Sequence, residues 1–294
     1  MNDLINTLLQ GLMLGGLYAL FATGLSLSFG IMRLVNIAHG DLIVLGGYAA
    51  WFATRPLTAL GPVAPWLGFV AAVPAMALLT YGLQRVLLDR MLGQGLLPPL
   101  LVTFGLSIVA QNAMLMAFSP DVRSIDTGPL ATASVDLGGT VAVGVLPLAV
   151  TVVAVTVITA LQWLLRGTAL GRAFRAASDD PVTAQLMGID RKHLYGLALA
   201  LSGAVVAAAG VFLAMRTTIS PTDGPARLIY AFEAVIIGGL GSLWGTLAGG
   251  AILGVAQALG AALNPGWGIL AGHLVFLAVL MLRPEGLFPR TRDR

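Results

Sequence analysis

Nine runs of mostly apolar residues, each at least sixteen residues long, follow one another along this chain of 294 residues. A helix needs about 20 apolar residues to cross a bilayer, where every backbone group must find its partner within the protein. A mean hydropathy of +0.91 with only 10% charged residues excludes a soluble globular protein. The sequence predicts an all-α polytopic membrane protein with about nine transmembrane helices, eight and ten being the alternatives. The expected segments are 5–29, 37–54, 66–84, 96–118, 142–165, 194–215, 228–243, 246–263 and 267–282.

The composition excludes several classes of function. The chain has no cysteine and three scattered histidines, so neither a disulfide framework nor a metal site is expected. It lacks a P-loop, a nucleophile elbow and a basic stripe with interleaved aromatics, so we expect no cofactor, no enzymatic activity and no nucleic-acid partner. The 37 glycines, several with the spacing of Gly250 and Gly254, predict closely packed helices in lipid.

Basic residues predict the orientation of the chain in the membrane. Twelve of the sixteen fall on one side of the expected segments, whereas Arg55, Arg123, Arg216 and Arg227 fall on the other. Lysine and arginine in short loops are retained on the cytoplasmic face. The N-terminus is therefore expected outside, and the C-terminus inside. We expect a single transmembrane domain over 1–294, with halves of about 1–165 and 193–294 joined by a cytoplasmic loop, 166–192. The first segment lacks the basic start of a signal peptide and is expected to remain as a helix.

The two longest polar segments predict surface structure. Within 166–192, Gly171 and Pro181 bracket a stretch able to form a short helix with one apolar face. On the opposite side, 119–141 has turn residues around short alternating runs. That segment is either a small hairpin or a plain linker.

A short motif occurs twice, with one copy in each half. Asp41 precedes four largely branched apolar residues and the pair Gly46-Gly47, and Glu233 precedes a similar run and the pair Gly238-Gly239. Five segments per half would place the copies in opposite orientations, which predicts an inverted repeat around a midplane pathway. Chance similarity is the alternative, because glycine pairs are common in membrane helices.

Each copy also interrupts a helix. Polar residues precede Asp41, and a stretch from Ser220 rich in proline and glycine precedes Glu233. Irregular backbone at membrane depth is tolerated only inside protein or beside water, so both breaks predict half-helices at a pathway. As alternatives, Asp41 acts as a helix cap, Glu233 pairs with Arg227, and His273 makes one structural hydrogen bond. The expected pathway residues are Asn36, His39, Asp41, Gly46, Gly47, Glu233, Gly238 and Gly239.

Four blocks resemble one known family: NIAHGDLIVLGGY (36–48), GRAFRAASDDPVTAQLMGID (171–190), S-P-x-x-G (220–224) and AFEAVIIGGLGSLWGTLAGG (231–250). They are similar to the LivH-type permease subunit of branched-chain amino acid ABC importers. The last block alone would also suit ribose-type permeases of the same superfamily. The resemblance implies a LivM-type second permease, two cytoplasmic ATP-binding subunits that hydrolyse ATP, and a periplasmic substrate-binding protein, in the lipid of the bacterial inner membrane.

The resemblance gives the polar loop a role as the docking site for the ATP-binding subunit, with Arg172 and Arg175 orienting a helix whose apolar residues enter a groove. The residues expected in this coupling loop are Gly171, Arg172, Phe174, Arg175, Ala176, Asp179, Leu186 and Gly188. Two other functions remain open: a secondary transporter or channel that uses Asp41 and Glu233 as ion sites, and a scaffold without a pathway. Relatives that handle other amino acids, amides or urea leave the substrate open.

Overall fold

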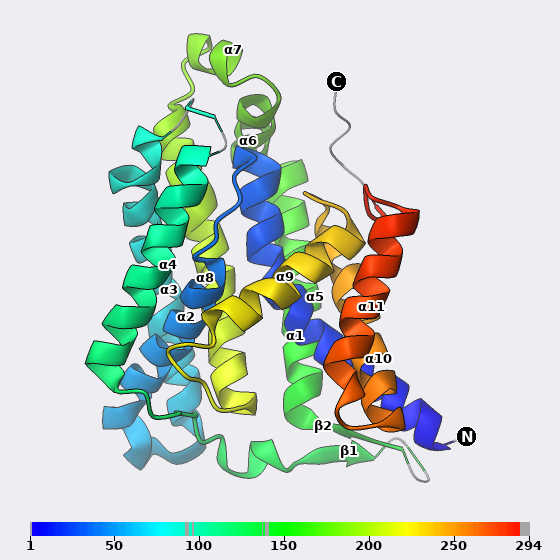
Figure 1. Cartoon of the computed structure of the whole chain (residues 1–294). Helices are drawn as coiled ribbons and strands as arrows, with labels where there is room; N and C mark the ends of the chain where they lie inside the picture. Colours follow the sequence, from blue (N-terminus) through cyan, green and yellow to red (C-terminus); the bar gives the residue numbers. More distant parts are fainter. Residues whose placement is uncertain (1, 92–93, 96, 137, 139–140, 289–294) are drawn as a thin grey trace.

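The protein is a bundle of helices in this computed structural model, which describes all residues except 1, 92–93, 96, 137, 139–140 and 289–294 (Figure 1). Six helices of the described part are long and apolar enough to cross a membrane. The predicted all-α polytopic membrane fold is therefore confirmed. These helices are α1 (Asn2–Met32), α3 (Ala64–Val86), α4 (Leu97–Phe118), α5 (Val145–Gly167), α8 (Arg191–Arg216) and α10 (Leu243–Leu263).

Three further apolar helices are short: α2 (His39–Thr54), α9 (Gly224–Gly238) and α11 (Trp267–Leu282). At about 1.5 Å per residue, fifteen or sixteen residues extend roughly 24 Å, less than the ~30 Å hydrocarbon core. All nine expected segments thus coincide with helices, but α2 and α9 are the two half-helices. The helix α9 ends five residues before the expected limit of 243, because Gly239 and Gly241 turn the chain at φ 101° and 78°.

The helices before and after the polar loop occupy equivalent places. The helix α1 packs against α8, α9 and α10, and α8 packs correspondingly against α1, α2 and α3. The helix α2 packs on α3 and α4, as α9 packs on α10 and α11, although the contact of α10 with α11 has no comparable counterpart between α3 and α4. Because α1 and α8 run in opposite directions (Figure 1), the arrangement supports the predicted inverted repeat.

The polar segments lie at opposite ends of the bundle (Figure 1). The strands β1 (Ser134–Asp136) and β2 (Ala142–Gly144) form an antiparallel hairpin near the start of α1, which confirms the predicted hairpin. We call this the hairpin end. At the loop end, one short helix was expected, but two form, α6 (Ala169–Asp179) and α7 (Pro181–Leu186). Asp180 accepts hydrogen bonds from two backbone N–H groups of α7 and so starts a new helix, whose first residue is the proline. Short 3₁₀ helices complete the chain: η1 (Arg55–Val63), η2 (Leu88–Arg90) and η3 (Gly128–Ala131).

Candidate transport site

The two half-helices begin at the same point inside the bundle. A Cβ atom added to Gly40 would lie 2.8 Å from the backbone nitrogen of Leu228, and one added to Gly224 would lie 2.9 Å from the backbone nitrogen of Asp41. Only residues without side chains permit this approach. The first turns of α2 and α9 are therefore packed backbone to backbone.

Asp41 lies at this junction. Its side chain is buried and accepts a hydrogen bond of 2.5 Å from Ser107 of α4, whose hydroxyl in turn accepts one of 3.2 Å from Gln111. The carboxylate also contacts Gly224, so it lies at the positive ends of two helix dipoles. Ala38 is the N-cap of α2 and no side chain caps that helix, so the alternative that Asp41 is a cap is wrong.

The residues around Asp41 fix the half-helix α2 to its neighbours. His39 Nε2 donates a 2.7 Å hydrogen bond to the carbonyl of Phe21 in α1, and Asn36 accepts one of 3.0 Å from the backbone of Ala38. Gly46 and Gly47 face α8, where added Cβ atoms would lie within 2.7 and 2.9 Å of backbone atoms. The structure places all four of these expected pathway residues at contacts within the chain.

Glu233 lies in the third turn of α9, farther from the start of its half-helix than Asp41 is from the start of α2. Its partner is His273 Nδ1 of α11, so this histidine makes a hydrogen bond within the chain. The alternative pairing with Arg227 is wrong, because Arg227 pairs with Asp223 at 3.3 Å. The glutamate side chain is 5% exposed and that of His273 is 39% exposed, so the pair runs from the interior toward the surface.

A polar stripe along α9 was not predicted. Arg227, Tyr230 and Glu233 are spaced by three residues and share a face of the helix. The ring of Tyr230 stacks on Tyr18 of α1 with centroids 5.1 Å apart, and the Tyr18 hydroxyl donates a 2.6 Å hydrogen bond to Gln257 of α10. The spacing of three was visible in the sequence, but the partners of the stripe come from helices distant in the chain.

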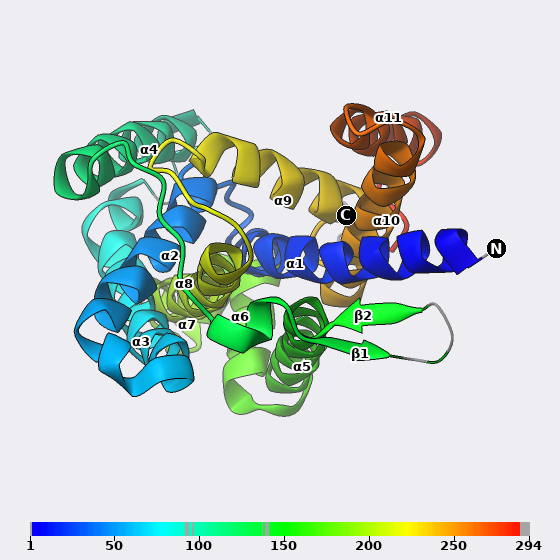
Figure 2. The same cartoon turned by 90° about the horizontal axis from the view of Figure 1, so that it is seen from below.

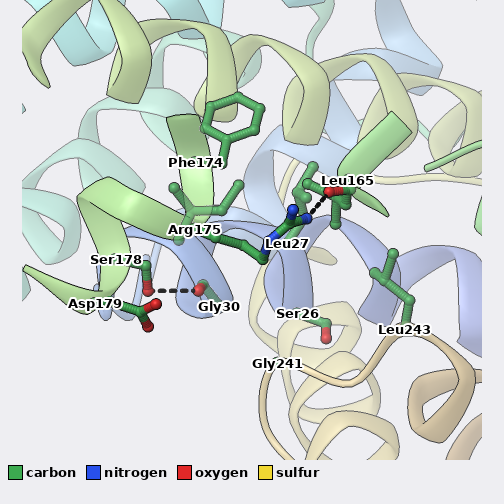
Figure 3. Close-up of a pocket in the computed structure, with 11 residues that line it drawn as sticks. Ser26, Leu27, Gly30, Leu165, Phe174, Arg175, Ser178, Asp179, Gly241 and Leu243 are labelled. Carbon is green, nitrogen blue, oxygen red and sulfur yellow. Dashed lines mark hydrogen bonds between the residues drawn. The ribbon is translucent and has the colours of Figure 1, made fainter. Parts of the chain in front are cut away.

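The inner face of α6 is joined to the ends of two long helices (Figure 3). Phe174 is buried, Arg175 donates a hydrogen bond to the Leu165 carbonyl at the end of α5, and Ser178 donates one of 3.1 Å to Gly30 of α1. A cavity of about 160 Å³ lies between these residues and the turn at Gly241, which follows α9. The buried Gly171 contacts backbone carbonyls at the end of α5.

The remaining expected coupling residues are exposed. Arg172, Ala176 and Gly188 are exposed outside the cavity, whereas Asp179 is exposed and lines the cavity at Gly241. Leu186 is 82% exposed and Met187 is nearly as exposed, whereas Phe174 was expected on the same outward apolar face and is instead packed inside. Hydrogen bonds from the Thr183 side chain and from backbone N–H groups of α7 hold the pKa of Asp180 below its usual range.

The protein family described as "Branched-chain amino acid transport system / permease component" matches residues 7–282. The chain belongs to this permease family. The permease is 30% identical to the high-affinity branched-chain amino acid transport system permease protein BraD of Pseudomonas aeruginosa, over 97% of this chain and 96% of that protein. It is 29% identical to LivH of Escherichia coli K12, with the same coverage of both chains.

A second type of relative matches part of the permease. It is 28% identical to LivM of Escherichia coli K12 over 127 residues, which are 42% of this chain and 30% of that protein. No solved structure matches the permease. Family membership and six apolar helices of spanning length make the chain a multi-pass membrane transport subunit.

Proposed function

We propose that this permease is one of two membrane subunits of an ABC importer that moves branched-chain or related amino acids across the bacterial inner membrane. The nearly full-length match to LivH and BraD carries the proposal. In it, a LivM-type subunit completes the pathway, two ATP-binding subunits supply the energy, and a periplasmic binding protein delivers the substrate. The permease itself binds no cofactor and hydrolyses no ATP.

The position of α9 supports a second membrane subunit. The helix lies at the surface of the bundle between α4 and α11 (Figure 2), and Ile229 on it is 49% exposed. The chain reaches α9 through the irregular segment 217–223, where Ile219 exchanges two backbone hydrogen bonds with Arg123. The helix α9 itself is too short to cross the bilayer, so a protein partner or a water-filled cavity must cover the end that stops inside it. The polar stripe of Arg227, Tyr230 and Glu233 suits a pathway at such an interface.

The outer face of α6 and α7 supports a cytoplasmic partner. Leu186 and Met187 form an exposed apolar pair on a loop that also carries exposed charges such as Arg172, a composition typical of docking surfaces. The inner face of α6 contacts Gly30 and lines the cavity at Gly241. A displacement of this loop by a bound partner would therefore be transmitted to the ends of α1 and α9.

The docking proposal predicts a loss of coupling when the outer face changes. We expect Leu186→Glu and Arg172→Glu each to lower amino-acid uptake at least tenfold. The first places a charge in the apolar core of the interface, and the second removes the cation that orients the partner. Uptake and ATP hydrolysis are measured on the co-purified complex in proteoliposomes.

The matched control is Val135→Glu, which places the same charge on an exposed apolar residue of β1 at the hairpin end. Coupled hydrolysis at the wild-type rate in both loop variants would contradict the docking site. Uptake by the permease alone, without ATP-binding subunits, would instead favour a secondary transporter.

The proposed orientation has a separate test, because the chain contains no cysteine. Single cysteines at Val122, 61% exposed at the hairpin end, and at Lys192, exposed at the loop end outside the exposed apolar pair, are offered to a membrane-impermeant maleimide in intact spheroplasts. We expect Val122→Cys to be labelled and Lys192→Cys to be labelled only after lysis. The opposite pattern would invert the topology.

A further inference from the structure

Arg123, Arg216 and Arg227 each have one buried guanidinium nitrogen without a hydrogen-bond partner in the described part of the chain, and of these three only Arg216 also lacks an acidic partner. Arg216 ends α8, and Arg227 lies in the first turn of α9. The Nη1 atom of Arg216 and the Nε atom of Arg227 are buried without a hydrogen-bond partner. Arg227 forms an ion pair with Asp223, but no acidic side chain of the described residues lies within ion-pair distance of Arg216. Arg216 is half-buried and its charge has no acidic partner among the described residues, which leaves that charge to be balanced by an anion from outside the chain.

Arg216 lines a recess of about 390 Å³ at the hairpin end, between the segment after α4 and the end of α8. Its other polar residues include Thr127, Asp126 and Thr218. Thr127 is 3% exposed, and its buried hydroxyl has no hydrogen-bond partner within the described residues. Recesses of roughly 300–1,000 Å³ accommodate small ligands, so the volume fits a free amino acid.

The charges of the recess complement a zwitterion. Arg216 offers a planar pair of donors, the geometry that binds a carboxylate through two hydrogen bonds. Asp126 is exposed, and one of its carboxylate oxygens accepts a 2.8 Å hydrogen bond from the backbone N–H of Gly128. It forms no ion pair within the described residues, so its charge can attract an ammonium group. Ile125 and Met215, both largely buried, form the apolar part of the recess wall.

We propose that this recess is a substrate site in which Arg216 binds the carboxylate of the transported amino acid and Asp126 attracts its ammonium group. The inference rests on the proposed function, since it names how an amino-acid importer would recognise its substrate before the pathway. Arg216 also lies near enough to the Tyr18 phenol to interact with it electrostatically, so the site adjoins the polar cluster of Tyr18, Tyr230 and Gln257.

The test uses the complete importer in proteoliposomes, with leucine as the probe and leucinamide, which keeps the ammonium but lacks the carboxylate, as the comparison. We expect Arg216→Gln to raise the KM for leucine at least tenfold and to leave leucinamide uptake within about twofold of the wild type. Arg123→Gln is the matched control, because Arg123 lies at the same end and is already paired with Asp121 at 3.4 Å. That control should leave both KM values unchanged.

Three outcomes would overturn the inference. The first is an unchanged leucine KM in Arg216→Gln; if that variant fails to assemble, an unchanged KM in Arg216→Lys, which lacks the planar pair of donors, has the same meaning. The second is an equal loss of leucine and leucinamide uptake. The third is a tenfold weaker affinity of the binding protein for the permease, which would assign Arg216 to a carboxylate of that protein. A wild-type importer that transports no amino acid overturns the proposed function as well, whereas the three outcomes above leave it standing.

Discussion

Valine in place of Gly40 is expected to prevent assembly of a folded permease. A Cβ at this position would meet the carbonyl oxygen of Gly224 and the backbone nitrogen of Leu228, both of which belong to α9. Neither can move unless the whole half-helix moves, and α9 is held by Glu233 and Tyr230. Overpacking a core costs about 1–3 kcal/mol when side chains can adjust, and a backbone clash costs more. Since net stabilities are only about 5–15 kcal/mol, this change removes a large fraction.

The control for this substitution is Gly105→Val, in the middle of α4, where an added Cβ would meet no atom within 4 Å. Both changes place the same β-branched residue in a membrane helix, so they differ only in the contact. The measurements are the yield of monodisperse protein in detergent and its thermal unfolding midpoint. Midpoints that agree within about 2 °C would mean that the half-helices are not packed backbone to backbone.

The helical framework was predictable because its signals are local. Apolar runs fix where helices lie in a membrane protein, and the polar and glycine-containing breaks before Asp41 and after Ser220 fix the two half-helices. The partners of the ionisable residues were not predictable in the same way. Glu233 and His273 are forty residues apart and meet only because α9 packs on α11, whereas Arg227 had seemed a nearer partner along the chain.

Local sequence signals also could not predict whether the apolar face of the loop helix points into the protein or toward a partner. The pattern around Phe174 correctly indicated an amphipathic helix, but periodicity alone does not tell whether the chain itself or a partner covers the face. Here the end of α5 covers it, and the exposed apolar pair lies beyond the break at Asp180.

The repeated motif likewise did not predict where its two acids lie in their helices. Its two acids occupy matching places in the sequence pattern, yet one lies in the first turn of α2 and the other in the third turn of α9.

Asp41→Asn is expected to lower uptake at least tenfold while the complex still assembles. The carboxylate lies in the first turn of α2 and against the first residue of α9, so two positive dipole ends stabilise its charge. Each such interaction contributes about 0.3–1 kcal/mol when exposed and up to ~2 kcal/mol when partly buried. Asparagine keeps the shape but loses this attraction, and its amide N–H groups would face the backbone N–H groups at one of the two helix ends. The two half-helices should then separate at the junction during the motion that transport requires, and uptake should fall.

Two variants separate this role from simpler ones. Ser107→Ala removes the 2.5 Å hydrogen bond to Asp41 and the 3.2 Å hydrogen bond that Ser107 accepts from Gln111, and it should have a smaller effect, of about 1–3 kcal/mol, on unfolding. Asp3→Asn removes a first-turn acid from α1 at an exposed position, where no second helix begins, and should leave uptake unchanged. Uptake is measured in proteoliposomes at equal amounts of assembled complex. If Asp41→Asn transports as well as Asp3→Asn, the charge at the junction has no part in transport, and the two half-helices are held by glycine packing alone.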